Sequence, residues 1–464
     1  MRTLKNAILV SFVAMLIGGC AVGPDFIAPN PDLPAQWKTA EQNSSAAALN
    51  RWWEKLDDPA LNTLVNKALE QNKEIAIAAA RNESFMAQLG VVESNLLPQF
   101  EAGASMSRQE LSATTSNRTS SFNKQTSTYG LNIAMSRFEI DFWGKYARAE
   151  ESAKAALLSS EYNRQMVRSS IVANVVSAYN ALLTQHRLLD NADKNRILAV
   201  QIASITQVKW DQGVGSYSDV LHAGASADEA RGAIAPIESK ISTLENILSL
   251  LAGEYPKHFP ISKDDISFKT IDVPAGLPSN LLKRRPDILA AEASWHSVNA
   301  SIGVAKAAYF PSFSLTAMLG LQSAELSNLL KSPSRVWQIA PSVTMPIFTA
   351  GRTKSEVDFA QAQTKESQAY YEQTLLKAFG DVDNALKARQ TLQEEANALN
   401  SAYKKYLQAH RVSTIEYESG KTGYLPLLIT KQSLIANENR IVLNEEAKKE
   451  NFITLCKALG GGWE

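Results

Sequence analysis

Four short segments of the chain alternate between apolar and polar residues with a period of two, which predicts β-strands with two different faces. In the third segment Phe313 and Leu315 face one side and Ser314 faces the other. Strands of this kind are typical of a transmembrane β-barrel, where one face meets lipid and the other the lumen. An antiparallel sheet with one wet face would show the same pattern and stays an alternative. The strands are expected at about residues 99–108, 128–141, 312–321 and 336–348.

Two long stretches contain no proline, 145–210 and 352–417. Each stretch of about 65 residues would span roughly 100 Å as a single helix. Apolar residues recur at spacings of four and three, as in Leu375, Phe379 and Val382, which indicates coiled-coil packing. A soluble helical bundle would show the same stripe, so this alternative also stays open.

Each long helix is followed by a glycine-rich turn and a return helix, the latter expected at 218–251 and at 425–459. The turn glycines are Gly213, Gly215, Gly420 and Gly423. Because glycine tolerates the positive φ of a helix end, we expect this conformation at all four.

The two turns belong to an internal duplication. Gly213 aligns with Gly420, and in the same register Tyr217 aligns with Tyr424. Each half holds a helix, two strands and a long helical hairpin. The expected division is a first repeat at 56–253, an inter-repeat linker at 254–285, a second repeat at 286–460 and a C-terminal tail at 461–464.

The N-terminus has the features of a bacterial signal peptide at residues 1–19. Arg2 and Lys5 flank the start of an apolar run that is too short to cross a bilayer as a permanent helix. The run ends in Gly18-Gly19-Cys20, which resembles a lipobox, so we expect acyl chains such as palmitate on Cys20. Residues 20–55 then form a lipidated extended segment. An ordinary signal peptide with a chance cysteine is the alternative.

Composition argues against several other functions. The 47 basic and 47 acidic residues balance, which gives no support for nucleic-acid binding. Two cysteines and five scattered histidines predict neither a disulfide framework nor a metal site. No motif supplies a nucleophile, a base and an acid together, so we expect no catalytic residues, no enzyme activity and no cofactor apart from the covalent lipid.

Four strands cannot close a membrane barrel, because known single-chain barrels begin at about eight. An open sheet edge in lipid would leave backbone groups without hydrogen bonds, so the chain is expected to oligomerise. Two copies would give about eight strands with a filled interior, whereas three would give about twelve strands around a lumen. A lumen continued by helices of roughly 100 Å indicates a duct.

Three segments carry a resemblance to a known family: RWWEKLDDPAL at 51–61, LLKRRPDI at 281–288 and CAVGPDF at 20–26. Together with the duplication, they resemble the outer membrane factor (TolC-like) family and its NodT-type branch of efflux lipoproteins. The resemblance covers essentially the whole mature chain. It implies a mixed α+β membrane protein, in which a homotrimer forms a twelve-stranded transmembrane β-barrel, with four strands per chain, continued by a long α-helical coiled-coil barrel in the periplasm.

The resemblance also implies a location and a function. Such ducts lie in the bacterial outer membrane, in contact with its lipid, and work with a periplasmic adaptor protein and an inner-membrane transporter, here expected to be of the resistance-nodulation-division type. We therefore expect the exit duct of a tripartite efflux system that passively conducts drugs or other small molecules. The alternatives are a type I protein-secretion exit duct and a structural envelope lipoprotein without transport.

Finally, the resemblance assigns a periplasmic tip, which closes the duct and meets the adaptor. Its residues in this chain are Gly213, Gly215, Tyr217, Asp219, Gly420, Gly423 and Tyr424. Related ducts carry acidic residues in the second tip, whereas residues 424–430, YLPLLIT, contain none. Asp219 in the first tip is expected either to take part in the gate or to cap the start of the returning helix.

Two further motifs have a structural interpretation. Pro286 suits the start of a helix, and Asp287 suits its first turn because a carboxylate there favours the helix dipole. Trp52 and Trp53 are expected to anchor the N-terminal segment onto the helices.

Overall fold

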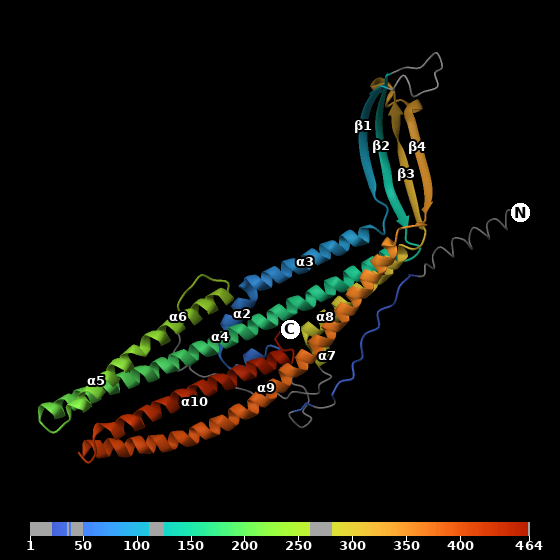
Figure 1. Ribbon diagram of the computed structural model, residues 1–464. Helices are drawn as coiled ribbons and strands as arrows, with labels where there is room; N and C mark the ends of the chain where they lie inside the picture. Colours follow the sequence, from blue (N-terminus) through green and yellow to red (C-terminus); the bar gives the residue numbers. More distant parts are fainter. Residues whose placement is uncertain (1–20, 35–36, 39–49, 111–124, 260–280, 463–464) are drawn as a thin grey trace. The chain divides into compact units, whose positions relative to one another are not determined.

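A computed structural model of the protein describes residues 21–34, 37–38, 50–110, 125–259 and 281–462. The signal peptide, Cys20, most of the inter-repeat linker and the last two residues lie outside the described residues. Within these ranges the chain combines helices with four β-strands (Figure 1).

Both halves of the chain begin with helices, continue through two strands and end in a long helical hairpin. The first half contains η1 (Trp52–Leu56), α2 (Pro59–Gln71), α3 (Lys73–Ser94), β1 (Phe100–Glu110), β2 (Gln125–Ile140), α4 (Lys145–Asp211), α5 (Tyr217–Gly232) and α6 (Ile234–Leu251). The second half contains α7 (Leu281–Arg284), α8 (Pro286–Ala307), β3 (Ser312–Ser323), η3 (Leu326–Asn328), η4 (Ser332–Ser334), β4 (Arg335–Thr344), α9 (Arg352–Glu418) and α10 (Tyr424–Ala458).

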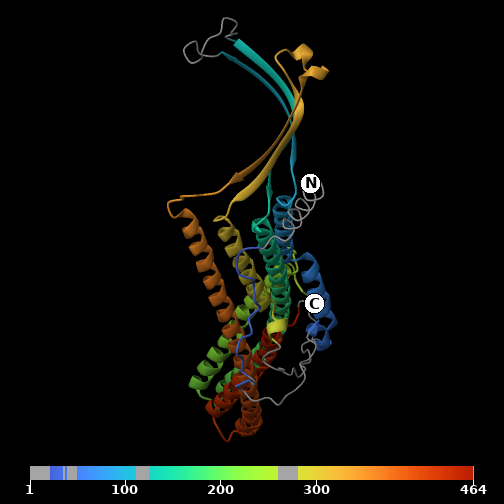
Figure 2. The ribbon, with the colours of Figure 1, turned by 90° about the vertical axis from the view of Figure 1, so that its right-hand side faces the viewer.

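The strands form one antiparallel sheet in the order β1-β2-β3-β4 (Figure 1). Figure 2 shows that this sheet is curved. Their register aligns apolar residues in rows across the sheet, since Ile133 is opposite Leu319 and Leu319 is opposite Trp337. The neighbouring row holds Asn132 and Gly320. The sheet therefore has one apolar face and one face of polar and small residues, as the alternation along each strand requires.

One strand is shorter than the alternation predicts. The apolar positions continue to residue 347, but β4 ends at Thr344. Pro346 follows closely, and its backbone nitrogen has no hydrogen to donate to a ladder. Pro341 lies within β4, opposite Leu315, which is consistent with the position of β4 at an edge of this sheet.

The chain folds into two compact units, each assembled from both halves of the sequence. The first holds the N-terminal residues up to Asn30 together with Arg81–Ser160 and Ala290–Tyr371, and it contains the sheet. The second holds Pro31–Ala80, Glu161–Leu289 and Glu372–Glu464, and it contains both hairpin turns. The compact units thus cut across the predicted repeats, because each repeat has its strands in one unit and its turn in the other.

The core of the second unit is aromatic where the N-terminal segment joins it. Trp52 and Trp53 are each 1% exposed, and the ring of Trp52 lies edge-on to Phe452 of α10 at 5.7 Å between centroids. Burial of two indole rings stabilises this attachment by several kcal/mol, of the order of 2–3 kcal/mol for each. The tryptophans are thus part of the packing.

The first return helix differs from the single helix expected at 218–251. It is divided into α5 and α6 at Ala233 (Figure 1). Pro236 explains the division, because it cannot donate a hydrogen bond to the carbonyl of Gly232 and its ring clashes with that carbonyl in a regular helix. The second return helix, α10, is continuous over its 35 residues.

None of the helices in the described part of the chain is both long enough and apolar enough to span a bilayer.

Candidate functional site at the hairpin tips

The two hairpin turns have the same backbone geometry. Gly213 has φ 77° and Gly420 has φ 72°, so both adopt the left-handed conformation that terminates a helix. In the first turn the N–H of Val214 donates to the carbonyl of Lys209 at 3.0 Å, and in the second the N–H of Lys421 donates to Glu416 at 2.9 Å. These equivalent bonds satisfy helix-end carbonyls that would otherwise lack a partner.

The other two turn glycines do not have the positive φ that was expected. Gly423 has φ −73° and ψ −178°, an extended conformation open to any residue, and a side chain there would meet no atom within 4 Å. Gly215 is absent from the positive-φ residues, and its requirement is steric instead. A Cβ at Gly215 would lie 3.0 Å from the backbone nitrogen of Trp210. The prediction for Gly215 and Gly423 was therefore wrong, because glycine alone does not reveal which of its properties a turn uses.

Tyr424 belongs to a small core between the two hairpins rather than to a surface. It is 2% exposed and packs with residues from α4, α5 and α9. Its ring meets that of Tyr417 at 6.0 Å between centroids. Burial raises the pKa of Tyr424, and the nearby Asp219 carboxylate adds to this increase. The members of the core are Ile202, Ala223, Tyr417, Tyr424 and Leu427.

Tyr417 is the centre of a set of contacts that sequence reasoning missed. The Nζ of Lys209 lies 3.6 Å from the centroid of the Tyr417 ring and donates to the Tyr417 carbonyl at 3.2 Å. The hydroxyl of Thr206 is 3.3 Å from the Tyr417 hydroxyl. Tyr417 lies three residues before the turn glycine Gly420, so its place near the tip could be predicted from the sequence. Nothing in the sequence pairs it with α4.

Asp219 does not cap the returning helix. The N-cap of α5 is Ser216, whose side chain accepts a hydrogen bond from the N–H of Ser218. Asp219 lies in the first turn, half-buried, where its charge favours the helix dipole. Tyr217 is 54% exposed and packs against Trp210 at 5.4 Å between ring centroids. Of the predicted tip residues, the structure thus brings Asp219 close to Tyr424 and leaves Tyr217 on the surface.

A second candidate site lies in the first unit, immediately after Cys20. The N–H of Val22 donates to the carbonyl of Trp143 at 3.0 Å, and Asp25 pairs with Arg148 at 2.5 Å. Gly23 has φ 109°, and a Cβ there would lie 2.5 Å from the Cα of Gly303. Residues 21–26 are therefore closely fitted to α4 and α8, although Cys20 itself lies outside the described residues.

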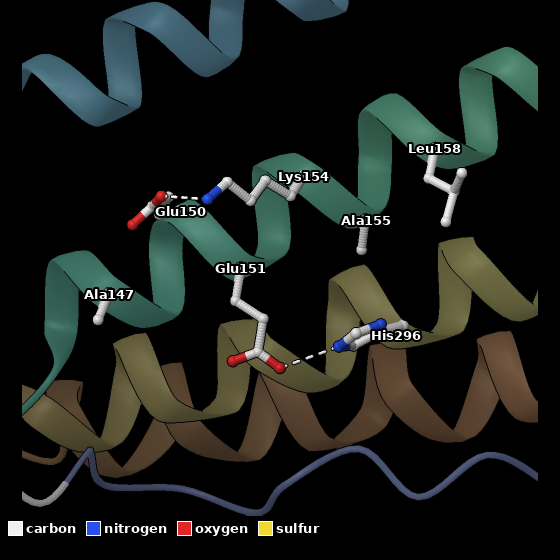
Figure 3. Close-up of a pocket in the computed structure, with 7 residues that line it drawn as sticks. All are labelled: Ala147, Glu150, Glu151, Lys154, Ala155, Leu158 and His296. Atoms are coloured by element: carbon white, nitrogen blue, oxygen red, sulfur yellow. Dashed lines mark hydrogen bonds and ion pairs between the residues drawn. The ribbon is translucent and has the colours of Figure 1, made fainter.

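The next residue of this segment, Phe26, stacks on the ring of His296 at 4.5 Å between centroids. The Nε2 of His296 is 2.9 Å from a carboxylate oxygen of Glu151 (Figure 3). Burial acts to raise the pKa of Glu151, but hydrogen bonds from His296 and Arg148 outweigh it, so the pKa is lowered. We call the fitted residues Ala21–Phe26 the N-terminal strap.

Glu151 and His296 also line an open pocket between α4 and α8, of about 350 Å³ (Figure 3). Its carboxylates already have cationic partners, since Glu150 pairs with Lys154 and Glu151 with Arg148. Among the described residues no cluster of His, Cys, Asp and Glu side chains could hold a metal ion. The pocket residues are Ala147, Glu150, Glu151, Lys154, Ala155, Leu158 and His296.

The RRPD motif forms a structural clamp in the second unit. The Arg285 guanidinium donates to Asp287 at 2.7 Å, to Asp381 of α9 at 3.2 Å and to the carbonyl of Ala458 at 3.2 Å. Since Ala458 is the last residue of α10, Arg285 joins the end of that helix to α9 and to the start of α8. Pro286 begins α8, as its fixed φ favours.

Comparisons with known proteins agree on one family. A model of the outer membrane efflux proteins matches residues 64–254 and 277–461. The chain is 30% identical to the antibiotic efflux pump outer membrane protein ArpC of Pseudomonas putida, over 99% of this chain and 96% of that protein. It is also 30% identical to the cation efflux system protein CusC of Escherichia coli O6:H1, over 97% of this chain and 98% of that protein.

Solved channel structures show the same fold. The CmeC outer membrane channel of Campylobacter jejuni is 26% identical, with a TM-score of 0.88 and 96% of each chain covered. The open MtrE outer membrane channel of Neisseria gonorrhoeae is 30% identical, with a TM-score of 0.82, and the match covers 96% of this chain and 99% of that one.

Proposed function

We propose that this chain, which belongs to the outer membrane efflux protein family and is the outer membrane exit duct of an efflux system, works as a homotrimer around a single lumen. The family is one of channels rather than enzymes, so its function is conduction. The observation that carries the trimer is the sheet, whose two outer strands each have one edge with no strand partner in the described part of the chain.

The unpaired edges of β1 and β4 are complementary. Successive strands are antiparallel, so β1 and β4 run in opposite directions, and β4 of one copy suits antiparallel pairing with β1 of the next. In hydrocarbon each unpaired backbone group costs several kcal/mol, which favours closure. Three copies would give about twelve strands, enough to leave a lumen, whereas two would give a filled barrel of about eight.

The apolar face of the sheet supports its contact with lipid. Ile133, Leu319 and Trp337, which form one row across the strands, are 57%, 67% and 69% exposed. Three large apolar side chains in one exposed row are unfavourable in water and suit the outer face of a membrane barrel. The opposite face, with Asn132 and Gly320 in the neighbouring row, would then line the lumen.

The helices that flank the edge strands support assembly in the same way. In the first unit, Met86 and Val91 on α3, which leads into β1, are each 59% exposed. Phe359 on α9, which follows β4, is 64% exposed. A neighbouring copy that pairs its β4 with β1 would bring its α9 towards α3 and cover these apolar side chains.

The hairpin tips are proposed to be the closed periplasmic end and the docking site of an adaptor protein, itself bound to an inner-membrane transporter of the resistance-nodulation-division type. The observation in favour is the buried core around Tyr417 and Tyr424, which holds the two hairpins of a chain together. The proposed tip residues are Gly213, Gly215, Tyr217, Asp219, Gly420, Gly423 and Tyr424.

The cargo is proposed to be small organic molecules. The relative ArpC is named for antibiotic efflux and TtgC of the same species for toluene efflux, and both match 99% of this chain. Anchoring by acyl chains on Cys20 is part of the same proposal, supported by the lipobox and by the close fit of the N-terminal strap beside it.

The test is native mass spectrometry of the detergent-purified protein together with conductance in planar bilayers. Three chains and a steady single-channel conductance are expected. A stable monomer that retains its β-sheet signal in circular dichroism would contradict the closure of strand edges between copies. A trimer without conductance would instead favour a structural envelope lipoprotein.

A further inference from the structure

Lys431 occupies a position in the second hairpin that normally holds an apolar residue. It lies in α10 behind the tip, between Leu427 and Leu434, at the alternating spacing of four and three that marks a helix core. It is 3% exposed, and its Nζ has no hydrogen-bond partner among the described residues. A lysine ammonium is rarely buried unless it is paired, so this position requires an explanation.

His410 of α9 faces Lys431 across the hairpin. The rings of Tyr417 and Tyr424 meet nearer the turn, and the same antiparallel register brings residue 410 beside residue 431. The Nδ1 atom of His410 is buried without a hydrogen-bond partner in the described part of the chain. Burial lowers the pKa of His410, and the positive charge of Lys431 lowers it further. Two basic groups therefore lie opposite one another in the seam between α9 and α10.

The surrounding helices provide no carboxylate for Lys431 among the residues that the structure describes. Leu427, one turn before it, packs with Ile202 of α4 and Ala223 of α5. Several charged groups of the adjoining turns have partners of their own, and burial is the one resolved cause that lowers the pKa of Lys431, to about 8. The pairs are Arg196–Asp193 and Lys194–Asp190 on α4 and Arg231–Asp228 on α5, while Glu438 of α10 interacts with Lys194.

The two groups act in different pH ranges. The folded pKa of Lys431, about 8, lies below the ordinary value of 10.5, so its charge destabilises the hairpin fully below pH 8 and ceases to do so as the pH rises to 10.5. The pKa of His410 is lowered from 6.5, so it contributes nothing above pH 6.5 and destabilises the hairpin as the pH falls below that value. At neutral pH the unpaired charge of Lys431 lies between α9 and α10. Acidification adds the positive charge of His410 beside it.

We propose that Lys431 and His410 form an acid-sensitive weak point behind the tip of the second hairpin, at which protonation of His410 loosens α10 from α9. The positive charge of Lys431 keeps this part of the hairpin weakly stable at neutral pH, and the charge on His410 then repels it. Given the proposed function, in which the tips close the duct, acidification would favour the open tip.

The direct test is hydrogen exchange of the full-length protein in detergent, measured by mass spectrometry and corrected for the intrinsic pH dependence of exchange. In the wild type, protection of the segment 424–438 is expected to fall between pH 7.5 and pH 5.5. Lys431→Met should increase protection at pH 7.5 by about tenfold or more, since a pKa lowered from 10.5 to about 8 corresponds to more than a tenfold change in the folding equilibrium. His410→Gln should remove most of the fall at pH 5.5.

Lys404→Met, which removes an exposed lysine of α9, is the matched control and should leave protection unchanged. If Lys431→Met does not assemble, Lys431→Leu provides the same test. Equal protection of wild type and both variants at the two pH values would overturn the weak point. Conductance at the same pH values tests the tip as a gate separately: a pH-dependent protection with constant conductance would keep the weak point and reject the gate.

Discussion

Lys209 lies over the ring of Tyr417, with its Nζ 3.6 Å from the ring centroid and 3.2 Å from the carbonyl oxygen of the same residue. One side chain of α4 thus binds the end of α9 through both the ring and the backbone of a single tyrosine. The contact stands beside the buried pair of Tyr417 and Tyr424, so it contributes to the link between the two hairpins.

Replacement of Lys209 by Met should loosen this link. A cation–π contact at a partly exposed site stabilises by about 1 kcal/mol, and the charged hydrogen bond adds a similar amount. We expect a higher single-channel conductance at unchanged trimer content. The matched control is Lys421→Met, which removes an exposed lysine of the second turn. Wild-type conductance in Lys209→Met would show that the contact does not restrain the tip.

Gly420 should be far more sensitive to substitution than Gly423. The left-handed backbone of Gly420 costs about 1–2 kcal/mol for a residue with a Cβ and more for a β-branched one, whereas Gly423 is extended with open space beside it. Gly420→Val is therefore expected to impair drug resistance in a complemented deletion strain while the trimer persists. Gly423→Ala serves as the control, and equal loss of resistance in both variants would refute this distinction.

Cys20→Ser should abolish labelling by radioactive fatty acid and weaken membrane retention. The other cysteine, Cys456, is fully buried in α10, and burial raises the pKa of its thiol, so it is a poor acceptor. Cys456→Ser should therefore keep full labelling. Label that persists in Cys20→Ser would exclude the lipobox. Barrel insertion is expected to survive, because the strands bury their own apolar face in the bilayer.

Arg285→Met should reduce the thermal stability of the assembled protein. Removal of the guanidinium leaves the carbonyl of Ala458 and the carboxylates of Asp287 and Asp381 without their shared donor. Breaking a buried pair costs about 3–5 kcal/mol, and the partial exposure of both carboxylates reduces this to about 2–3 kcal/mol.

Arg285→Lys should recover little of that loss, because an ammonium cannot reproduce the planar fork of donors. Thermal unfolding followed by circular dichroism measures both variants. The control is Lys283→Met, at an exposed position of the same segment. A melting temperature of Arg285→Met equal to that of the control would show that the clamp is dispensable.

Acid should release the N-terminal strap. The pKa of Glu151 is lowered from 4.5, so its carboxylate stabilises the fold above pH 4.5, and this contribution is lost as the pH falls through the folded pKa. Glu151→Gln should mimic acid at neutral pH and speed cleavage of the segment after Phe26 by an added protease. Glu150→Gln, next to it, loses its pairing with Lys154 but keeps the contacts of Glu151, so it should be cleaved like the wild type.

The parts that could be predicted from sequence are those with a long or repeated pattern. Period-two alternation placed the four strands, and the duplication was sufficient to relate Gly213 to Gly420, which have the same backbone conformation. These signals are strong because each is a property of many residues at once.

The features that could not be predicted depend on contacts between residues far apart in the sequence, or on the position of a single side-chain oxygen. Nothing in the sequence pairs Lys209 with Tyr417, since they lie on separate hairpins and meet through tertiary packing. The sequence suggested Asp219 as a possible cap of α5, and only the geometry shows that Ser216, three residues earlier, is the cap. Pro236, in contrast, was a visible reason to divide the first return helix.

That division has a mechanical consequence. The first hairpin returns through two rods, α5 and α6, joined at Ala233, whereas the second returns through the single rod α10. In a ring of three identical chains, six hairpins would stand side by side, and jointed and unjointed ones would alternate. Duplication would make such a ring nearly sixfold in shape, yet bending at Ala233 would be available to every second hairpin. The ring would therefore bend at three hairpins out of six. Movement of its tips would then have threefold symmetry, although the ring itself is nearly sixfold in shape.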